Sequence, residues 1–191
     1  MTRTRIGVLA LQGAVMPHKP HIEALDAEFI PVKTAAQFDS VDGFILPGGE
    51  STTMLKLIDR FGLWDVLVDQ FARKPVWGIC AGSILMAETV SKPAQKSFGL
   101  LPMSVERNGY GRQIDSHKAQ ICDYEVSLIR APVIAAIEDG VDVLASHDDT
   151  PVWVQKGHYM ASTFHPELTL NFPSPMHRAF VEMVCGNINL T

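Results

Sequence analysis

A cysteine framed by two glycines is the side chain of this sequence with the clearest chemical potential. Residues 78–82 read Gly-Ile-Cys-Ala-Gly, at the point where an apolar run ends and a helical pattern begins. A sharp turn between a strand and a helix needs glycine at its crowded positions, and it lifts the residue between them above the sheet. The first amides of the helix then stabilise a thiolate. The pattern predicts that Cys80 is a nucleophile, whereas Cys122 and Cys185 are expected to be small buried side chains without chemistry.

A histidine with a carboxylate two residues later supplies the base that a cysteine nucleophile needs. Residues 165–167 read His-Pro-Glu. The proline biases His165 toward an extended conformation, in which residues i and i+2 project to the same side, so Glu167 is expected to orient the imidazole. The other six histidines are interpreted as surface or satisfied core residues: His18, His21, His117, His147, His158 and His177. His18 and His21 have helical spacing, but no cysteine or carboxylate cluster joins them, so no metal site is predicted.

A third segment has the composition of an anion-binding turn. Residues 46–52 read Leu-Pro-Gly-Gly-Glu-Ser-Thr and lie between an apolar strand pattern and a helical pattern. Two adjacent glycines allow backbone amides to face a concavity that holds an oxyanion or a carboxylate, and Ser51 or Thr52 is expected to cap the helix. A plain Gly-Gly turn in front of a helix explains the segment equally well. A Walker-type phosphate loop is excluded, because no Gly-Lys-Ser or Gly-Lys-Thr follows.

Hydrophobic periodicity predicts the elements that position these residues. Short apolar runs, typical of strands covered on both faces, lie at residues 6–11, 29–32, 41–46 and 75–79. Helical spacing of apolar residues lies at residues 54–61, 63–71, 84–89 and 176–184. Between residues 103 and 164 the pattern changes to short β-rich runs broken by Gly, Pro and Asp. We therefore expect an α/β fold in which a mostly parallel sheet receives antiparallel additions in the second half of the chain.

Length and charge limit the class of protein. The chain has 191 residues and a formal net charge of −5, without runs of like charge, so nucleic acid is not expected as a partner. The longest nearly uninterrupted apolar stretch, residues 76–87, is shorter than the roughly 20 residues of a membrane-spanning helix, so no membrane association is expected. Three cysteines without paired spacing fit free thiols in the cytoplasm. No linker-like stretch divides the chain, and residues 1–191 are expected to form one domain.

The two motifs around Cys80 and His165 together resemble those of the class I (triad) glutamine amidotransferases. Within that family, the chain is similar to the glutaminase subunits of two-protein pyridoxal 5'-phosphate synthases over nearly its whole length. The segments that carry the similarity are residues 7–15, 46–54, 105–108, 111–116 and 129–132. The resemblance implies hydrolysis of L-glutamine to glutamate and ammonia, delivery of the ammonia to a synthase subunit for vitamin B6 biosynthesis, and no cofactor or metal.

The resemblance also implies a role for each matching residue. Cys80 is expected to form a glutamyl thioester, with His165 as the base and Glu167 as the carboxylate that orients it. Glutamine contacts are expected from Gly49, Glu50, Ser51, Arg107, Ile129 and Arg130. The oxyanion is expected to be held by backbone amides of Gly48, Gly49 and Ala81. Gln12, at the end of the first expected strand, is placed near the surface that meets the synthase.

Two alternatives share these motifs or this fold. A glutaminase subunit of another pathway, such as imidazole glycerol phosphate synthesis, is disfavoured by residues 106–108 and 111–113. A catalytically silent regulatory subunit is disfavoured by the intact cysteine, histidine and glutamate. The chain departs from the family at residues 16–20, Met-Pro-His-Lys-Pro, which is expected to affect only the edge that faces the partner. We therefore expect an active glutaminase with a three-layer, flavodoxin-like architecture.

Overall fold

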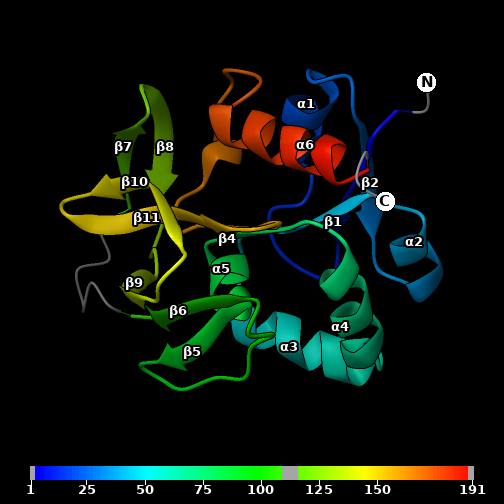
Figure 1. Cartoon of the computed structure of the whole chain (residues 1–191), viewed down its shortest axis with the longest axis horizontal. Coiled ribbons are helices and arrows are strands. Elements are labelled where there is room, and N and C mark those ends of the chain that lie inside the picture. The colour runs from blue at the N-terminus through cyan, green and yellow to red at the C-terminus, as the bar shows by residue number, and fades with distance from the viewer. Residues whose placement is uncertain (1–2, 109–115, 189–191) are drawn as a thin grey trace.

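A seven-stranded sheet forms the centre of the molecule. The computed structural model describes residues 3–108 and 116–188 (Figure 1). The strand order across the sheet is β10-β11-β12-β4-β3-β1-β2. Five of these strands run parallel: β1 Arg5–Leu9, β2 Glu28–Val32, β3 Gly43–Leu46, β4 Val76–Ile79 and β12 Tyr159–Ser162. Two strands extend the sheet in antiparallel pairing beyond β12, namely β11 Thr150–Lys156 and β10 Asp142–His147.

Helices cover both faces of the sheet. One face carries α1 His18–Glu23 and α6 Pro175–Ile188 (Figure 1). The opposite face carries α3 Ser51–Arg60, α4 Trp64–Arg73 and α5 Ala81–Met86, while the short α2 Ala35–Asp39 follows β2. The result is the three-layer α/β architecture with a mostly parallel sheet that the sequence predicts.

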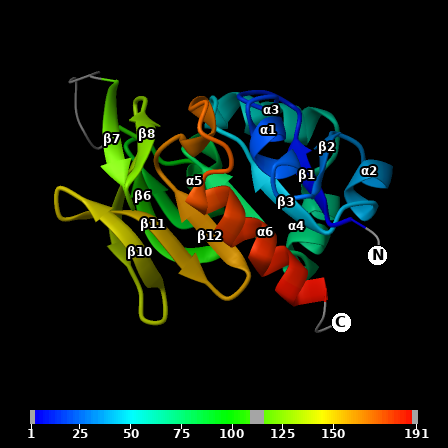
Figure 2. The same cartoon turned by 90° about the horizontal axis from the view of Figure 1, so that it is seen from above.

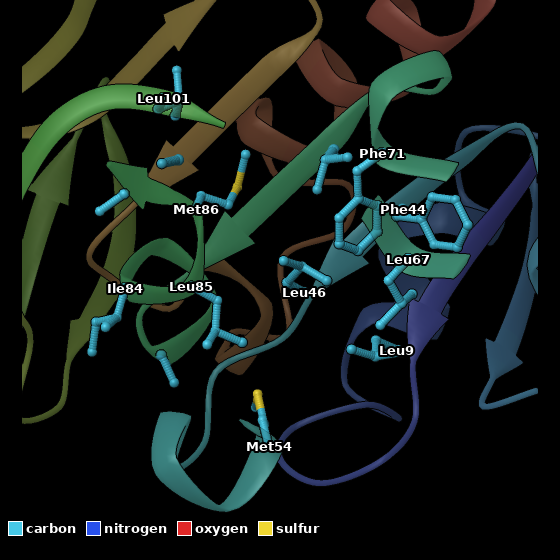
Figure 3. Close-up of a cluster of buried hydrophobic side chains, with 14 of the residues drawn as sticks. Leu9, Phe44, Leu46, Met54, Leu67, Phe71, Ile84, Leu85, Met86 and Leu101 are labelled. Atoms are coloured by element: carbon cyan, nitrogen blue, oxygen red, sulfur yellow. The ribbon is translucent and has the colours of Figure 1, made fainter. Parts of the chain in front are cut away.

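The sheet separates two apolar cores. In the first core, the rings of Phe44 from β3 and Phe71 from α4 have centroids 5.3 Å apart (Figure 3). In the second core, the ring centroids of Trp77 from β4 and Phe180 from α6 lie 5.8 Å apart. Ile45, next to Phe44, enters this second core, because successive side chains of a strand point to opposite faces. Every residue of β3 and β4 is buried, which explains why these strands read as continuous apolar runs.

The second half of the chain also builds two smaller sheets. One contains β5 Ala87–Ser91, β6 Leu101–Glu106 and β9 Val133–Ile137, and the other is the hairpin of β7 His117–Ile121 and β8 Tyr124–Leu128. Among the strands expected as antiparallel additions, β10 and β11 join the central sheet. Burial alternates along β6, as it does in a sheet with one covered face. The β7–β8 hairpin lies on the side of the molecule opposite to α2 (Figure 2).

Two detailed predictions are wrong. The helix expected over residues 84–89 ends at Met86, and β5 begins at the next residue, because this stretch contains β-branched residues that favour a strand. Cys122, expected to be buried, is exposed. It forms the two-residue turn between β7 and β8 with Asp123, and both residues have a positive φ, of 51° and 57°. Such hairpin turns face solvent. Cys185 is half-buried.

The two prolines of residues 16–20 fit the start of the first helix. α1 begins at His18, directly after Pro17, and Pro20 lies within its first turn. The amides of a first helical turn have no partner inside the helix, so a proline there removes no hydrogen bond. The departure from the family pattern is therefore compatible with an ordinary helix at this place.

Candidate active site

A cleft opens at the carboxyl ends of four neighbouring parallel strands. Gln12 follows β1, residues 48–51 follow β3, Cys80 follows β4 and His165 follows β12, and all of them line the cleft. Ligands of open α/β sheets bind at this edge. The cleft has a volume of about 480 Å³, which is within the usual range of small-molecule sites.

The cleft collects nearly all the residues that the sequence analysis assigns to chemistry or binding. Its lining includes Gly48, Gly49, Glu50, Ser51, Cys80, Ala81, Arg107, Ile129, Arg130 and His165. Glu167 is the exception, since it is 2% exposed and reaches the cleft through its contact with His165. Residues 111–115 of the similar segment 111–116 lie outside the described residues.

The turn that carries Cys80 is strained and tightly packed. Cys80 has φ 50° and ψ −105°, a conformation that costs free energy for a residue with a β-carbon and that is found mainly at functional sites. A β-carbon on Gly78 would come within 2.5 Å of the carbonyl oxygen of Gly82, and one on Gly82 within 2.0 Å of the carbonyl oxygen of Leu46. The two glycines are therefore needed for close approach of backbone to backbone, as the sequence predicts.

His165 and Glu167 form a buried hydrogen-bonded pair. Nδ1 of His165 lies 2.7 Å from Oε1 of Glu167. His165 is extended, as expected, but Glu167 lies in a short 3₁₀ helix, Pro166–Leu168, and not in an extended segment. Burial works against the charged imidazole, yet hydrogen bonds with Cys80 and Glu167 and their negative charges raise the pKa of His165 to about 10. Burial likewise opposes ionisation of Glu167, but its bond with His165 holds its pKa below the usual range.

The backbone of His165 is anchored to the β7–β8 hairpin. Its amide donates to the carbonyl of Ser127 at 2.8 Å, and the amide of Ser127 donates to the carbonyl of His165 at 3.2 Å. Two residues further along, the carbonyl of Ile129 lies 3.9 Å from Sγ of Cys80 and accepts its weak hydrogen bond. Arg130 follows with φ 44° and is exposed at the cleft. The hairpin thus supports the base and covers the sulfur.

The loop after β3 packs directly on the imidazole. A β-carbon on Gly48 would lie 2.1 Å from Cε1 of His165 and 2.8 Å from its Nδ1. Replacement of Gly48 by Ala must therefore move the ring or the loop. Because a displacement of about 1 Å costs catalysis on the order of 100-fold, we expect Gly48→Ala to lower kcat/KM for glutamine hydrolysis by roughly that factor.

A matched glycine substitution serves as the control for Gly48→Ala. Gly186 in α6 has open space around its α-carbon, so Gly186→Ala is expected to keep full activity. Ammonia release by both variants gives the comparison. Normal kinetics of Gly48→Ala would contradict the contact with His165.

The helix cap after this loop differs from the expected one. Glu50, and neither Ser51 nor Thr52, caps α3: its carboxylate accepts from the amide of Thr53 at 2.8 Å and from the amide of Thr52 at 3.3 Å. Burial opposes its ionisation, but these bonds lower the pKa of Glu50. Arg107 donates from Nη2 to the hydroxyl of Thr52 at 2.9 Å and to Glu50 at 3.4 Å. The carboxylate of Glu50 therefore organises the cleft wall, a role that its residue type alone does not reveal.

Two glutamines hold this wall in place, and the sequence analysis assigns neither to it. Oε1 of Gln12 accepts from the amide of Glu50 at 2.9 Å, and Oε1 of Gln95 accepts from the hydroxyl of Ser51 at 2.9 Å. Gln12, which is expected near the partner-facing surface, lines the cleft. Its place at the end of β1, at the same sheet edge as Cys80, is the signal that finds it. No such signal marks Gln95.

Comparison with known proteins shows the family to which the chain belongs. A model of the SNO glutamine amidotransferase family matches residues 8–186. The chain belongs to the SNO glutamine amidotransferase family. The "Pyridoxal 5'-phosphate synthase subunit PdxT" of Solibacter usitatus is 48% identical over 177 residues, which are 86% of this chain and 92% of the relative. The protein of the same name from Brevibacillus brevis is 42% identical over 188 residues, with 94% and 97% covered.

Solved structures share the fold of this chain. A crystal structure of a glutamine amidotransferase is 37% identical, has a TM-score of 0.85, and covers 94% of this chain and 98% of its own. A putative GMP synthase component from Thermoplasma acidophilum shares the fold, with a TM-score of 0.67 at 15% identity, over 100% of this chain and 98% of its own. The resemblance and the α/β fold class are thereby confirmed.

Two further features concern metals and membranes. Within residues 3–108 and 116–188, no three His, Cys, Asp or Glu side chains are grouped so that they would hold a metal ion. In the same part of the chain, no helix has the length and apolar character to span a bilayer.

Proposed function

We propose that this member of the SNO family is the glutaminase subunit of a pyridoxal 5'-phosphate synthase. It hydrolyses L-glutamine to glutamate and ammonia and delivers the ammonia to a synthase subunit. The observation that carries this proposal is the alignment of a strained cysteine, an imidazole and a buried carboxylate in one cleft of a glutamine amidotransferase fold. The relatives at 42% and 48% identity, whose names assign them to pyridoxal 5'-phosphate synthase, favour this pathway over other users of ammonia.

The chemistry assigns one step to each group. Sγ of Cys80, as thiolate, attacks the side-chain amide carbon of glutamine, and the carbonyl oxygen becomes an oxyanion. The amide of Ala81 and an amide of the Gly48 and Gly49 turn hold that oxyanion. The C–N bond breaks as the imidazolium of His165 protonates the leaving nitrogen, which departs as ammonia. His165 then takes a proton from a water molecule, and the resulting hydroxide attacks the thioester carbon. The C–S bond breaks, glutamate is released and the thiolate of Cys80 is regenerated.

The raised pKa of His165 suits this sequence of proton transfers. The carboxylate of Glu167 stabilises the imidazolium, which leaves Nε2 to exchange a proton with the sulfur or the substrate nitrogen. The pair is buried at 8% and 0% side-chain exposure, so bulk water does not compete for these bonds.

The two arginines of the cleft are suited to the charged end of glutamine. A guanidinium grips a carboxylate through two parallel hydrogen bonds. Both contacts of Arg107 with the wall use Nη2, so its other donors can face the substrate. We expect Arg107→Ala and Arg130→Ala each to raise the KM for glutamine by roughly 10- to 100-fold with a smaller change in kcat, because a charged hydrogen bond to the substrate is lost. Glu50, Gly49, Ser51 and Ile129 complete the proposed contacts.

An exposed arginine far from the cleft controls for the loss of charge. Arg60, at the end of α3, is exposed, and Arg60→Ala is expected to leave the KM unchanged. Steady-state ammonia release at varied glutamine measures all three variants. An unchanged KM for Arg107→Ala or Arg130→Ala would reject the corresponding contact.

The mouth of the cleft has the character of a docking surface for the synthase subunit. Ile129 and Leu168 line the cleft and are 37% and 44% exposed, and Leu170 nearby in sequence is 91% exposed. Exposed apolar side chains grouped at a functional site favour contact with another protein. Gln12 lies in the wall of the same cleft.

Reconstitution tests the proposed function. The purified chain and the synthase subunit of the same organism are mixed with glutamine, and ammonia is measured with and without the synthase. We expect ammonia release to be far faster in the complex than with either protein alone. No release in a complex that forms by gel filtration would reject the glutaminase assignment, while release without any effect of the synthase would reject the proposed pathway.

The setting of the protein follows from the same proposal. We infer that residues 1–191 act as one glutamine amidotransferase domain, because both cores extend over the shared central sheet. We also infer a cytoplasmic location, since the three cysteines are free thiols, which are typical of proteins in reducing compartments.

A further inference from the structure

Three histidines that the mechanism does not use are buried beside the triad carboxylate. His18 and His21 of α1 are both 0% exposed, and His177 of α6 is 1% exposed. Ser174, directly before α6, is 0% exposed. Buried polar side chains are retained when they are hydrogen-bonded, so the partners of these rings indicate what they do.

Three of the four residues, Ser174, His177 and His18, form a continuous line of hydrogen bonds. Oγ of Ser174 lies 2.6 Å from Nδ1 of His177, and Nε2 of His177 lies 2.9 Å from Nδ1 of His18. The amide of His177 donates to Oγ of Ser174 at 3.1 Å. His21 stands beside this line: its Nδ1 accepts from the amide of Ser174 at 3.0 Å, and its ring stacks on His177 at 4.3 Å.

Of the two directions in which the protons of this line can point, the one that begins at Ser174 leaves a donor on His18. Burial lowers the pKa of His18 to about 4 and that of His177 well below the usual value, so each ring is neutral and carries one N–H. A hydroxyl oxygen accepts up to two hydrogen bonds and donates one, so Oγ of Ser174, which accepts from the amide of His177, still has its own proton to donate to Nδ1 of His177. His177 then donates from Nε2 to Nδ1 of His18. The remaining proton of His18 is on Nε2.

The line ends at an unpaired donor that lies near an unpaired acceptor. Among the described residues, Nε2 of His18 and Oε2 of Glu167 are both buried and have no hydrogen-bond partner. The two groups lie close enough for the charge of each to shift the pKa of the other. Oε1 of Glu167 is occupied by His165, so Oε2 is the atom that needs a donor. A buried carboxylate with one free oxygen and a buried N–H without an acceptor are complementary.

We propose that His18 is a positioning residue for Glu167, and that Ser174, His177 and His18 form a relay that supplies the second hydrogen bond of the triad carboxylate. In this relay Nε2 of His18 donates to Oε2 of Glu167, either directly or through one bridging water. It keeps Glu167 ionised and turned so that Oε1 meets His165. The proposal rests on the proposed glutaminase function for its kinetic consequence, but the hydrogen-bond line itself does not.

A metal site is the rival explanation for three converging histidines. One ring nitrogen of His18 is hydrogen-bonded to one of His177, and Nδ1 of His21 accepts from an amide, so these three nitrogens are not free to bind a metal. No metal-binding group of side chains is found among the described residues. The hydrogen-bond relay accounts for the observed contacts of all three rings.

The tautomers of the histidines test the relay without any variant. Long-range ¹H–¹⁵N correlation spectra of the full, uniformly labelled chain at pH 7 report which ring nitrogen carries the proton. We expect His18 and His177 to be neutral with the proton on Nε2, and the Nε2 proton of His18 to exchange slowly. A proton on Nδ1 of His18 would overturn the proposal, because that ring would then offer Glu167 no donor.

Variants of His18 test its consequence for Glu167. Besides His18, the groups that face this carboxylate are His165 from its own segment, with Cys80 beyond it, and His21 from α1. Without the donor, ionised Glu167 is less stable and supports the imidazolium less. We expect His18→Leu to lower kcat in the complex by about 10- to 100-fold, in the range of lost positioning contacts, with KM nearly unchanged. His18→Gln, which keeps an N–H, is expected to restore most of kcat.

Alkylation of Cys80 by iodoacetamide separates this proposal from the proposed function, since it requires no turnover. The pH at which alkylation becomes fast is expected to be higher in His18→Leu than in the natural chain and nearly normal in His18→Gln. His158→Leu, which removes a histidine at the opposite end of β12 from His165 and outside the cluster, is the control and is expected to keep the normal profile. Equal profiles for His18→Leu and the natural chain would overturn the positioning role, even if glutamine proves not to be the substrate.

Discussion

Replacement of Cys80 by alanine is expected to lower glutamine hydrolysis by the complex by about four to six orders of magnitude. Loss of a covalent nucleophile in a triad has this size because the remaining groups cannot form the acyl intermediate. The fold is expected to persist. Alanine accepts the φ of 50° no worse than cysteine does, and the lost hydrogen bond from Sγ to the carbonyl of Ile129, at 3.9 Å, is weak. Ammonia release and thermal unfolding of the same preparation measure both effects.

Cys122 provides a matched control for this prediction. It is a second non-glycine residue with a positive φ, of 51°, but it is exposed in a hairpin turn. Cys122→Ala is therefore expected to retain activity. An electrophilic glutamine analogue should label the natural chain and Cys122→Ala once, and Cys80→Ala not at all. Near-normal activity of Cys80→Ala, or labelling elsewhere, would remove the nucleophile from the mechanism.

Replacement of Glu167 by glutamine is expected to lower kcat by about three to four orders of magnitude. The size follows from triads in which the orienting carboxylate becomes an amide, because the amide favours the wrong tautomer of the histidine. Here the amide nitrogen of a glutamine would donate to Nδ1 of His165, which is 2.7 Å from the present oxygen. The ring would then carry its proton on Nε2 and could not accept the proton of the thiol. The loss of negative charge also lowers the pKa of His165.

The same substitution has a pH-dependent effect on stability. The pKa of His165 is raised to about 10, so its contribution is complete below about pH 6.5 and is lost as the pH rises through about 10. The pKa of Glu167 is lowered, so its contribution is complete above about pH 4.5 and is lost as the pH falls. The difference in free energy of unfolding between the natural chain and Glu167→Gln should therefore be largest between about pH 4.5 and about pH 6.5, where both contributions are complete. Urea unfolding at several pH values measures it.

An exposed glutamate on a strand gives the comparison for Glu167→Gln. Glu125 in β8 pairs with Lys118 at the surface, with a side chain 47% exposed. Glu125→Gln is expected to change kcat and unfolding little, since exposed ion pairs contribute little. If Glu167→Gln retained most of its activity, the carboxylate would not orient the base.

The central strands of the first half of the chain, β1, β3 and β4, are predictable from sequence because they are buried on both faces. β3 and β4 show as continuous apolar runs, and glycine is required at residues 78 and 82 because a β-carbon there would lie 2.5 and 2.0 Å from a carbonyl oxygen. The motif and its neighbours therefore identify the nucleophile, the base and the sheet edge where they meet. The fold class follows from the same pattern.

Other features could not be predicted, because they depend on contacts between residues that lie far apart in the sequence. The strands after residue 103 distribute among three sheets, and short alternating runs do not specify which partner each strand takes. Glu50 caps α3 although Ser51 and Thr52 are the usual capping types, because Arg107 and the wall of the cleft fix its carboxylate. The buried histidines come from both ends of the chain, and only tertiary packing of α1 on α6 brings them to Glu167.

The pair of backbone bonds between Ser127 and His165 gives the site a mechanical property. The hairpin that carries Ile129 and Arg130 over the cleft is joined to the same peptide group that aims the imidazole. We therefore expect a shift of the hairpin to move the backbone of His165, and with it the imidazole. Because Ile129 and Arg130 line the cleft directly after the hairpin, the fit of the substrate and the placement of the base depend on the same pair of bonds.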